Sequence, residues 1–194
     1  MSAPADLPLF PLQTVLFPAG RLPLRIFEQR YLEMAKACLR DDTAFGVCLI
    51  REGSEVGEPA LPEDVGCTAR IVDWDMPQLG VLQVVARGER RFRIRSRRVQ
   101  PDGLARAAAE FLAEETDAPL DAADLCVRVL RRIVEAAPAG LVESPPRYDS
   151  SAWVSARLAE LLPLSGASKQ RMLEMDDAPA RVEILRRLIS SSGK

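Results

Sequence analysis

The 194-residue sequence contains no histidine, and this absence excludes several classes of catalytic and metal site. Ser-His-Asp and Cys-His groupings need an imidazole as the general base. Many zinc sites need a histidine nitrogen as a ligand. Glycine-rich loops of the P-loop and dinucleotide-binding types are also missing. We therefore expect that the chain is not an enzyme and that it binds neither a cofactor nor a metal ion.

Paired cysteines and long apolar runs are absent as well. Cys38, Cys48, Cys67 and Cys126 form no Cys-x-x-Cys pair, and each lies among apolar neighbours, where cysteine acts as a small hydrophobe. No apolar run approaches the roughly 18 residues of a membrane-spanning helix. The first eight residues lack the basic and apolar regions of a secretory signal. The sequence predicts reduced thiols, a cytoplasmic location and no membrane partner.

Lysine is scarce, since only Lys36, Lys169 and Lys194 occur among the 26 basic residues and arginine supplies the rest. We attribute this bias to a GC-rich coding genome. The formal net charge is -2. A protein that coats nucleic acid usually carries a basic excess, so the charge does not favour a nucleic-acid partner.

Short apolar runs at strand spacing fill the first half of the chain. Proline interrupts the runs over 7–12, 14–18 and 22–27, as in edge or barrel-closing strands. Helical spacing over 28–40 predicts one inserted helix. Further strands are expected over 44–51, 65–74, 79–87, 92–97 and 103–114, with a hairpin connection at 75–78. Mainly antiparallel strands of this kind predict a small, twisted β-barrel.

Apolar residues at helical spacing follow residue 116. One helix is marked by Leu125, Val129 and Ile133, and others are expected near 153–162 and 168–175. The last helix begins around Asp177, where an aspartate cap and a proline in the first turn fit together. The sequence thus predicts an α+β chain, with a β-barrel domain over 1–116 and an α-helical bundle domain over 117–194.

The chain opens with LPLFPL at 7–12, VLFPAG at 15–20 and LPLRIFEQRY at 22–31. Further along come VGCTARI at 65–71, ARGERRFRI at 86–94, LLPLS at 161–165 and KQRMLE at 169–174. In this order, the segments resemble the N-terminal domain of Lon-type proteases, in the form seen in stand-alone members.

The resemblance implies a PUA-like β-barrel followed by an α-helical bundle. It also implies a module that engages unfolded polypeptides or a partner protein. The motifs of the Lon ATPase and of its Ser-Lys peptidase do not occur in the sequence, so proteolysis is not expected. The oligomeric state and the physiological ligand stay open.

The junction between the strand at 22–27 and the following helix offers one candidate binding patch. Arg25, Glu28 and Arg30 could form an exposed surface for polypeptide recognition. The favoured interpretation is structural: Arg25 pairs with Glu28, while Phe27 and Tyr31 lie in the core.

The expected hairpin tip offers a second candidate patch. Trp74, Met76 and Leu79 flank it, and an exposed methionine there could adapt to varied apolar partners. Burial of these side chains within the fold is slightly favoured over exposure.

An arginine-rich strand provides the alternative hypothesis of RNA binding, because PUA-like folds elsewhere bind RNA. The favoured interpretation is a solvated strand face whose charge is offset by the acidic loop around Glu52, Glu55 and Glu58. The candidate RNA-binding residues are Arg91, Arg93, Arg95 and Arg97.

Overall fold

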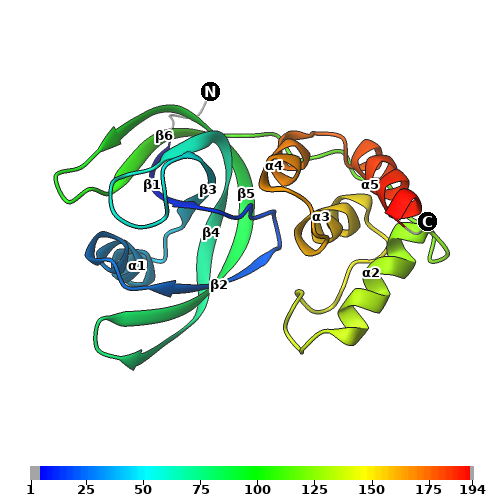
Figure 1. Ribbon diagram of the computed structural model, residues 1–194, viewed down its shortest axis with the longest axis horizontal. Coiled ribbons are helices and arrows are strands. Elements are labelled where there is room, and N and C mark those ends of the chain that lie inside the picture. Colours follow the sequence, from blue (N-terminus) through cyan, green and yellow to red (C-terminus); the bar gives the residue numbers. More distant parts are fainter. Residues whose placement is uncertain (1–4, 193–194) are drawn as a thin grey trace. The chain divides into compact units, whose positions relative to one another are not determined.

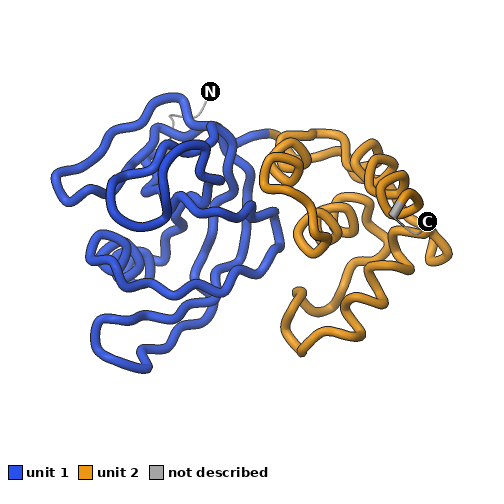
Figure 2. The backbone as a smooth tube through the Cα atoms, in the orientation of Figure 1, with its two compact units in different colours: residues 1–112 blue, residues 113–194 orange. Residues whose placement is uncertain are grey.

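The structure is a computed structural model that describes residues 5–192 of the chain. It divides into two compact units, residues 1–112 and 113–194 (Figure 2). Unit 1 contains the strands and one helix, and unit 2 contains four helices (Figure 1). The described chain is therefore α+β, with a mixed sheet and five helices. The domain division after residue 116 stays a prediction.

One sheet forms the body of unit 1, in the order β2-β5-β4-β3-β1-β6 with a further pairing between β5 and β6. The β1–β3 pair is parallel and the other pairs are antiparallel. Pairing thus runs from β5 through β4, β3, β1 and β6 back to β5, while β2 lies at the end of the order. The strands are β1 (Ala5–Leu12), β2 (Arg21–Ile26), β3 (Phe45–Glu52), β4 (Leu61–Gln78), β5 (Val81–Val99) and β6 (Ala105–Phe111).

Several expected strands were wrong in their limits. Residues 14–18 form no strand. The segments expected over 65–74, 79–87 and 92–97 belong to just two long strands, β4 and β5. Their turn is at 79–80 and not at 75–78, since Gln78 pairs directly with Val81. Gly80 has a φ of 82°, a backbone conformation that glycine adopts without steric cost.

The predicted inserted helix is confirmed as α1 (Gln29–Asp41), with Glu28 at its N-cap. The helix buries Tyr31, Met34 and Cys38 in the core of unit 1. The Tyr31 ring stacks on Phe10 of β1, with 4.2 Å between the ring centroids. This packing ties the helix to the sheet.

Unit 2 is built around α3 (Ser151–Leu161), which is buried along most of its length and contacts the other three helices. These are α2 (Leu125–Ala136), α4 (Gly166–Glu174) and α5 (Ala178–Ser192). The cap predicted for the last helix is confirmed, because Asp177 Oδ1 accepts a hydrogen bond of 2.9 Å from Ala180 N.

The helix predicted from Leu125, Val129 and Ile133 is confirmed as α2. Cys126, Val127 and Leu130 are buried, whereas Val129 and Ile133 are half-buried. Apolar residues lie on two sides of this helix, so periodicity alone does not decide which side packs against the neighbouring helices.

Asp117 connects the start of unit 2 to the first turn of α3. Its Oδ1 accepts hydrogen bonds from Ala118 N, Ser151 Oγ and Ala152 N at 2.9, 3.0 and 2.9 Å. Its Oδ2 accepts one of 2.8 Å from Ser150 Oγ. Burial raises the pKa of Asp117, but the hydrogen bonds from these four residues outweigh it and hold the pKa below the usual 3.8.

We expect Asp117 to make unit 2 sensitive to acid. A carboxylate with a lowered pKa contributes stability above its unfolded pKa, and this stability is lost as pH falls through the folded pKa, below about 4. Asp117→Asn should lower the free energy of unfolding by about 1 kcal/mol at pH 7, and the gap between the variant and the parent should be smaller at pH 3. Urea denaturation at both pH values measures this. Asp149→Asn, at a neighbouring exposed position, is the control, and an equal gap at both pH values contradicts the prediction.

Candidate functional site

The hairpin formed by β4 and β5 carries exposed apolar side chains near its tip. Trp74 is 54% exposed, Met76 43% and Leu79 97%, so the slight preference for their burial was wrong. We call these three residues the hairpin patch. Neighbouring exposed apolar side chains of this kind mark sites of contact with another molecule.

The exposure of the hairpin patch follows from the sheet pairing. Strand β3 pairs with β4 only as far as Ala69, and β2 pairs with β5 from Leu82 onward. Beyond Ala69, β4 therefore has no partner among the described strands on the side of β3, whereas β2 accompanies β5 as far as Leu82.

A groove lies where the hairpin meets β2. Its volume is about 360 Å³. Leu24, Val84 and Trp74 stand in register across β2, β5 and β4 and contribute to its wall. We call it the hairpin groove, and its lining residues are Pro23, Leu24, Arg25, Asp73, Trp74, Asp75, Gln83, Val84 and Val85.

A second groove, also of about 360 Å³, is lined by β2, the start of α1 and a loop near Glu55. Its rim is apolar, since Phe27 and Val56 are both exposed. We call it the helix groove. Its lining residues are Phe10, Leu12, Thr14, Leu22, Pro23, Leu24, Arg25, Ile26, Phe27, Glu28, Tyr31, Glu55 and Val56. The segment from Pro23 to Arg25 therefore lines both grooves.

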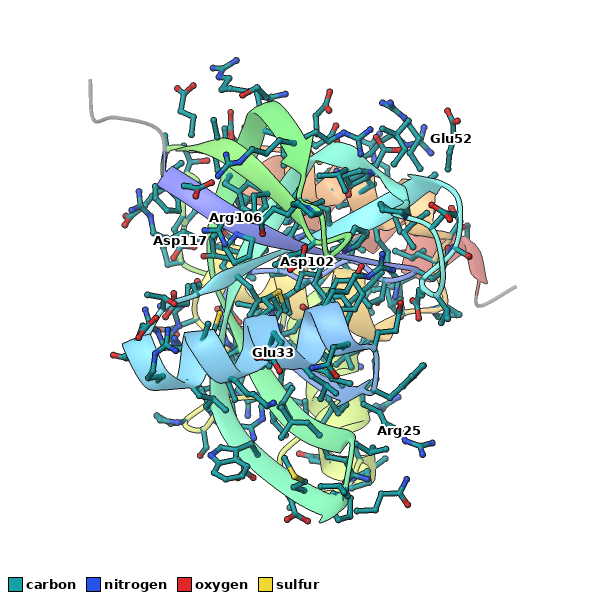
Figure 3. The ribbon with its side chains drawn as sticks, turned by 90° about the vertical axis from the view of Figure 1, so that its left-hand side faces the viewer. Arg25, Glu33, Glu52, Asp102, Arg106 and Asp117 are labelled. Atoms are coloured by element: carbon teal, nitrogen blue, oxygen red, sulfur yellow. The ribbon has the colours of Figure 1, made fainter. Side chains whose placement is uncertain are left out.

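The three residues of the first candidate patch lie in different environments. Arg25 is exposed (Figure 3) and lines both grooves. Glu28 pairs with Arg30 at 2.9 Å, so the expected pairing of Glu28 with Arg25 was wrong. Phe27 was expected in the core but is exposed, whereas Tyr31 is buried as expected.

Arg30 is buried and holds parts of unit 1 together. Its Nη2 donates a 2.7 Å hydrogen bond to Gly57 O, and its Nη1 donates one of 3.4 Å to Gly103 O. Its guanidinium lies over the Tyr31 ring, 4.7 Å from the centroid. Of the first patch, Arg25 alone has an exposed side chain that a ligand can reach freely.

The arginine-rich half of β5 does not form a uniform basic surface. Arg91 is buried, Arg93 is half-buried, and Arg95 and Arg97 are exposed. Arg95 pairs with Glu110 of β6. Arg97 Nη1 donates a long hydrogen bond of 3.4 Å to a backbone oxygen.

Arg95, Arg98 and Arg106 pair with carboxylates of other strands and not with the loop around Glu52, Glu55 and Glu58. Besides Glu110, Asp6 pairs with Arg98 and with Arg106, each at 3.0 Å. Burial raises the pKa of Asp6, but its hydrogen bonds with Arg98 and Arg106 outweigh it and lower the pKa overall. Much of the local positive charge is neutralised within the chain.

The cysteines offer no reactive site, because all four are free and buried. Burial raises the pKa of Cys126 to about 11 and also raises the pKa of Cys38 and Cys48. Such thiols stay protonated and are poor nucleophiles. Within residues 5–192, no group of three or more His, Cys, Asp or Glu side chains could hold a metal ion. None of the helices in that range is both long and apolar enough to span a bilayer.

Comparison with known protein families shows which family the chain belongs to. The family model of the ATP-dependent protease La (LON) substrate-binding domain matches residues 6–191. The chain belongs to the LON substrate-binding domain family. The resemblance seen in the sequence is thereby confirmed. The match is to this substrate-binding domain and not to the protease domain.

Full-length relatives of this LON-family chain are bacterial Lon proteases. Lon protease of Cytophaga hutchinsonii is 25% identical over 200 residues, and Lon protease 2 of Myxococcus xanthus is 26% identical over 197 residues. Each alignment covers 96% of this chain but 24% of the relative. The chain thus spans about a quarter of the length of these relatives.

Two solved structures share the LON-domain fold. A Lon N-terminal domain protein from Xanthomonas campestris is 38% identical with a TM-score of 0.76. The N-terminal domain of Mycobacterium avium complex Lon protease has a TM-score of 0.66 at 16% identity, which shows the fold alone. Each comparison covers 93% of this chain and 96% of the other.

Proposed function

We propose that this chain is a non-catalytic polypeptide-recognition module that binds unfolded segments or a partner protein. The observation that carries the proposal is the exposure of Trp74, Met76 and Leu79 at the end of a hairpin. Aromatic and methionine side chains are enriched at protein interfaces. Membership of a family described as a substrate-binding domain gives independent support.

We also propose a PUA-like β-barrel for the first unit and an α-helical bundle for the second, divided near residue 116. The circuit of pairings from β5 through β4, β3, β1 and β6 back to β5 supports the barrel. The contacts of α3 with α2, α4 and α5 support the bundle. Four free, buried cysteines support a cytoplasmic location, where thiols stay reduced.

The RNA-binding alternative has less support. It requires Arg91, Arg93, Arg95 and Arg97 to present charge on one accessible face. Arg91 is buried and Arg95 is paired with Glu110. We therefore keep RNA as a comparison ligand in the test and not as a second function.

Fluorescence anisotropy tests polypeptide recognition directly. The expected result is saturable binding to labelled, reduced and carboxymethylated lactalbumin, which cannot refold, and no binding to native lactalbumin. Raising the salt from 50 to about 200 mM should change this affinity little, because apolar contacts dominate. A single-stranded RNA run alongside should bind weakly if at all; affinity for RNA that falls steeply with salt would indicate phosphate contacts. Equal, negligible binding to both forms of lactalbumin refutes the proposal.

A further inference from the structure

Strand β2 ends the sheet order, with β5 as its one neighbour among the described strands. An edge strand presents backbone N–H and C=O groups that can pair with another extended chain. The helix groove is lined by every residue from Leu22 to Glu28. In the view of Figure 1, β2 lies between α1 and the β4–β5 hairpin.

The pairing register identifies the backbone groups that β2 leaves for a ligand. Gly88 N donates a hydrogen bond of 2.9 Å to Gly20 O, and the antiparallel register continues without a shift to Ile26. Bonding positions alternate along an antiparallel strand. The backbone N–H and C=O groups of Leu22 and Leu24 therefore point toward β5. Those of the alternate residues, at positions 21, 23 and 25, point to the free edge.

Arg21, Pro23 and Arg25 are the residues that face the free edge. Pro23 has no N–H, and proline is tolerated on a strand at such an outward position because no ladder hydrogen bond is lost. The free edge thus offers the N–H and C=O groups of Arg21 and Arg25 and the C=O group of Pro23. These groups are spaced to pair with alternate residues of an extended segment.

The charges around β2 favour a basic ligand. Glu28 and Glu55 line the helix groove, and Asp73 and Asp75 line the hairpin groove. Glu28 is paired with Arg30, but Asp73 and Asp75 form no ion pair with any of residues 5–192. Arg25 is the one cation that lines either groove, so carboxylates are in excess.

From the open edge, the apolar rim and the excess of carboxylates, we infer that this domain binds its ligand by strand addition. An extended polypeptide segment pairs with the free edge of β2, places apolar side chains against Phe27 and Val56, and carries lysine or arginine at intervening positions. Main-chain hydrogen bonds contribute affinity that depends little on the sequence of the ligand. The two grooves determine which ligand side chains fit. The inference rests on the proposed polypeptide recognition and adds the ligand class and binding mode.

A labelled heptapeptide of alternating valine and lysine is the probe, measured by fluorescence anisotropy. Two further forms carry N-methyl groups, one on every valine amide and the other on every lysine amide. Only one set of amides faces β2 in an added strand, so one form should lose affinity by about ten-fold or more and the other should bind like the parent. A peptide with glutamate in place of lysine should bind about ten-fold less tightly at low salt.

Variants of β2 test the same edge from the protein side. Arg25→Ala keeps the outward N–H, whereas Arg25→Pro removes it without touching the pairs with β5. Arg25→Pro should therefore bind the lysine peptide about five-fold less tightly than Arg25→Ala. Pro23→Ala adds an outward N–H and should increase affinity two- to five-fold, roughly the value of one hydrogen bond. Circular dichroism and thermal melting check that each variant is folded, and Pro23→Ala keeps the test decisive if Arg25→Pro does not fold.

The outcomes separate the binding mode from the function. Equal affinity of both N-methylated peptides, or unchanged affinity of Pro23→Ala, overturns strand addition while binding of unfolded lactalbumin keeps the proposed function. Preference for the glutamate peptide overturns the ligand class. Failure to bind both unfolded lactalbumin and the lysine peptide removes the proposed function and this inference with it.

Discussion

Replacing Trp74, Met76 and Leu79 together with serine is expected to weaken binding of unfolded lactalbumin about 100-fold, which corresponds to about 2.8 kcal/mol. Binding energy concentrates in a few large side chains near the centre of an interface, each worth about 2 kcal/mol or more on truncation. Trp74 is the strongest candidate for such a residue because it is exposed and also lines the hairpin groove. Anisotropy titrations of the triple variant and the parent measure the change.

The control for the triple variant is another set of exposed apolar residues. Val99 is 50% exposed and Ile184 is 42% exposed, and Val99→Ser with Ile184→Ser should leave the affinity unchanged. Exposed substitutions usually change stability by less than about 0.5 kcal/mol, so thermal melts of both variants should resemble that of the parent. Equal losses of affinity in the two variants would show that general surface hydrophobicity, and not the hairpin patch, causes binding.

The sequence predicts that the hairpin strands form, but it does not predict that their apolar side chains are exposed. Apolar and acidic residues alternate over 72–76, which is typical of a strand with one apolar face. Whether that face is covered depends on where the neighbouring strands stop. The pairing of β3 with β4 ends at Ala69, and no local pattern in the hairpin encodes that limit.

The turn of the hairpin shows how local and long-range information compete. Pro77 and the polar residues around it favour a connection at 75–78. The structure instead continues the β4–β5 pairing to Gln78 and Val81, with shifts in register on the way. The glycine at position 80 indicated the true turn, but a single glycine also fits many other places in a chain.

The charge partners of β5 could not be predicted from nearby sequence. Arg98 pairs with Asp6, 92 residues away, and Arg106 pairs with the same carboxylate. The acidic loop around residues 52–58 is nearer in the sequence and was therefore expected to offset the charge of these arginines. Pairing of β6 with both β1 and β5 brings these residues together, so the neutralised charge follows from topology.

Unit 2 depends on Arg181 of α5, whose side chain is fully buried. Its guanidinium pairs with Glu115, and its Nε donates a 2.9 Å hydrogen bond to Ser155 Oγ. Its Nη1 donates a 3.0 Å hydrogen bond to Met172 O. One side chain thereby connects the segment before α2 with α3, α4 and α5. Helical periodicity identified the helices, but it places arginine on a surface and does not predict this buried contact.

Arg181→Met is expected to lower the free energy of unfolding of unit 2 by about 3–5 kcal/mol, because it removes the guanidinium that pairs with the largely buried carboxylate of Glu115. Glu115→Leu added to Arg181→Met should restore part of the loss, since an apolar pair requires no buried charge. Ser155 Oγ and Met172 O still lack their donor in the double variant, so the recovery should be incomplete.

Urea denaturation followed by the fluorescence of Trp153 measures these changes. Trp153 of α3 is 3% exposed, and a Trp74→Phe background leaves it as the sole tryptophan of the chain, so the emission reports on unit 2. Arg187→Met, at an exposed position on the same helix, is the matched control and should change the free energy of unfolding by less than about 0.5 kcal/mol. A loss below about 1 kcal/mol for Arg181→Met would mean that apolar packing alone holds the four helices together. A large loss restored by the second substitution would assign the effect to the lost ion pair between Arg181 and Glu115, since a packing defect at position 181 would remain in both variants.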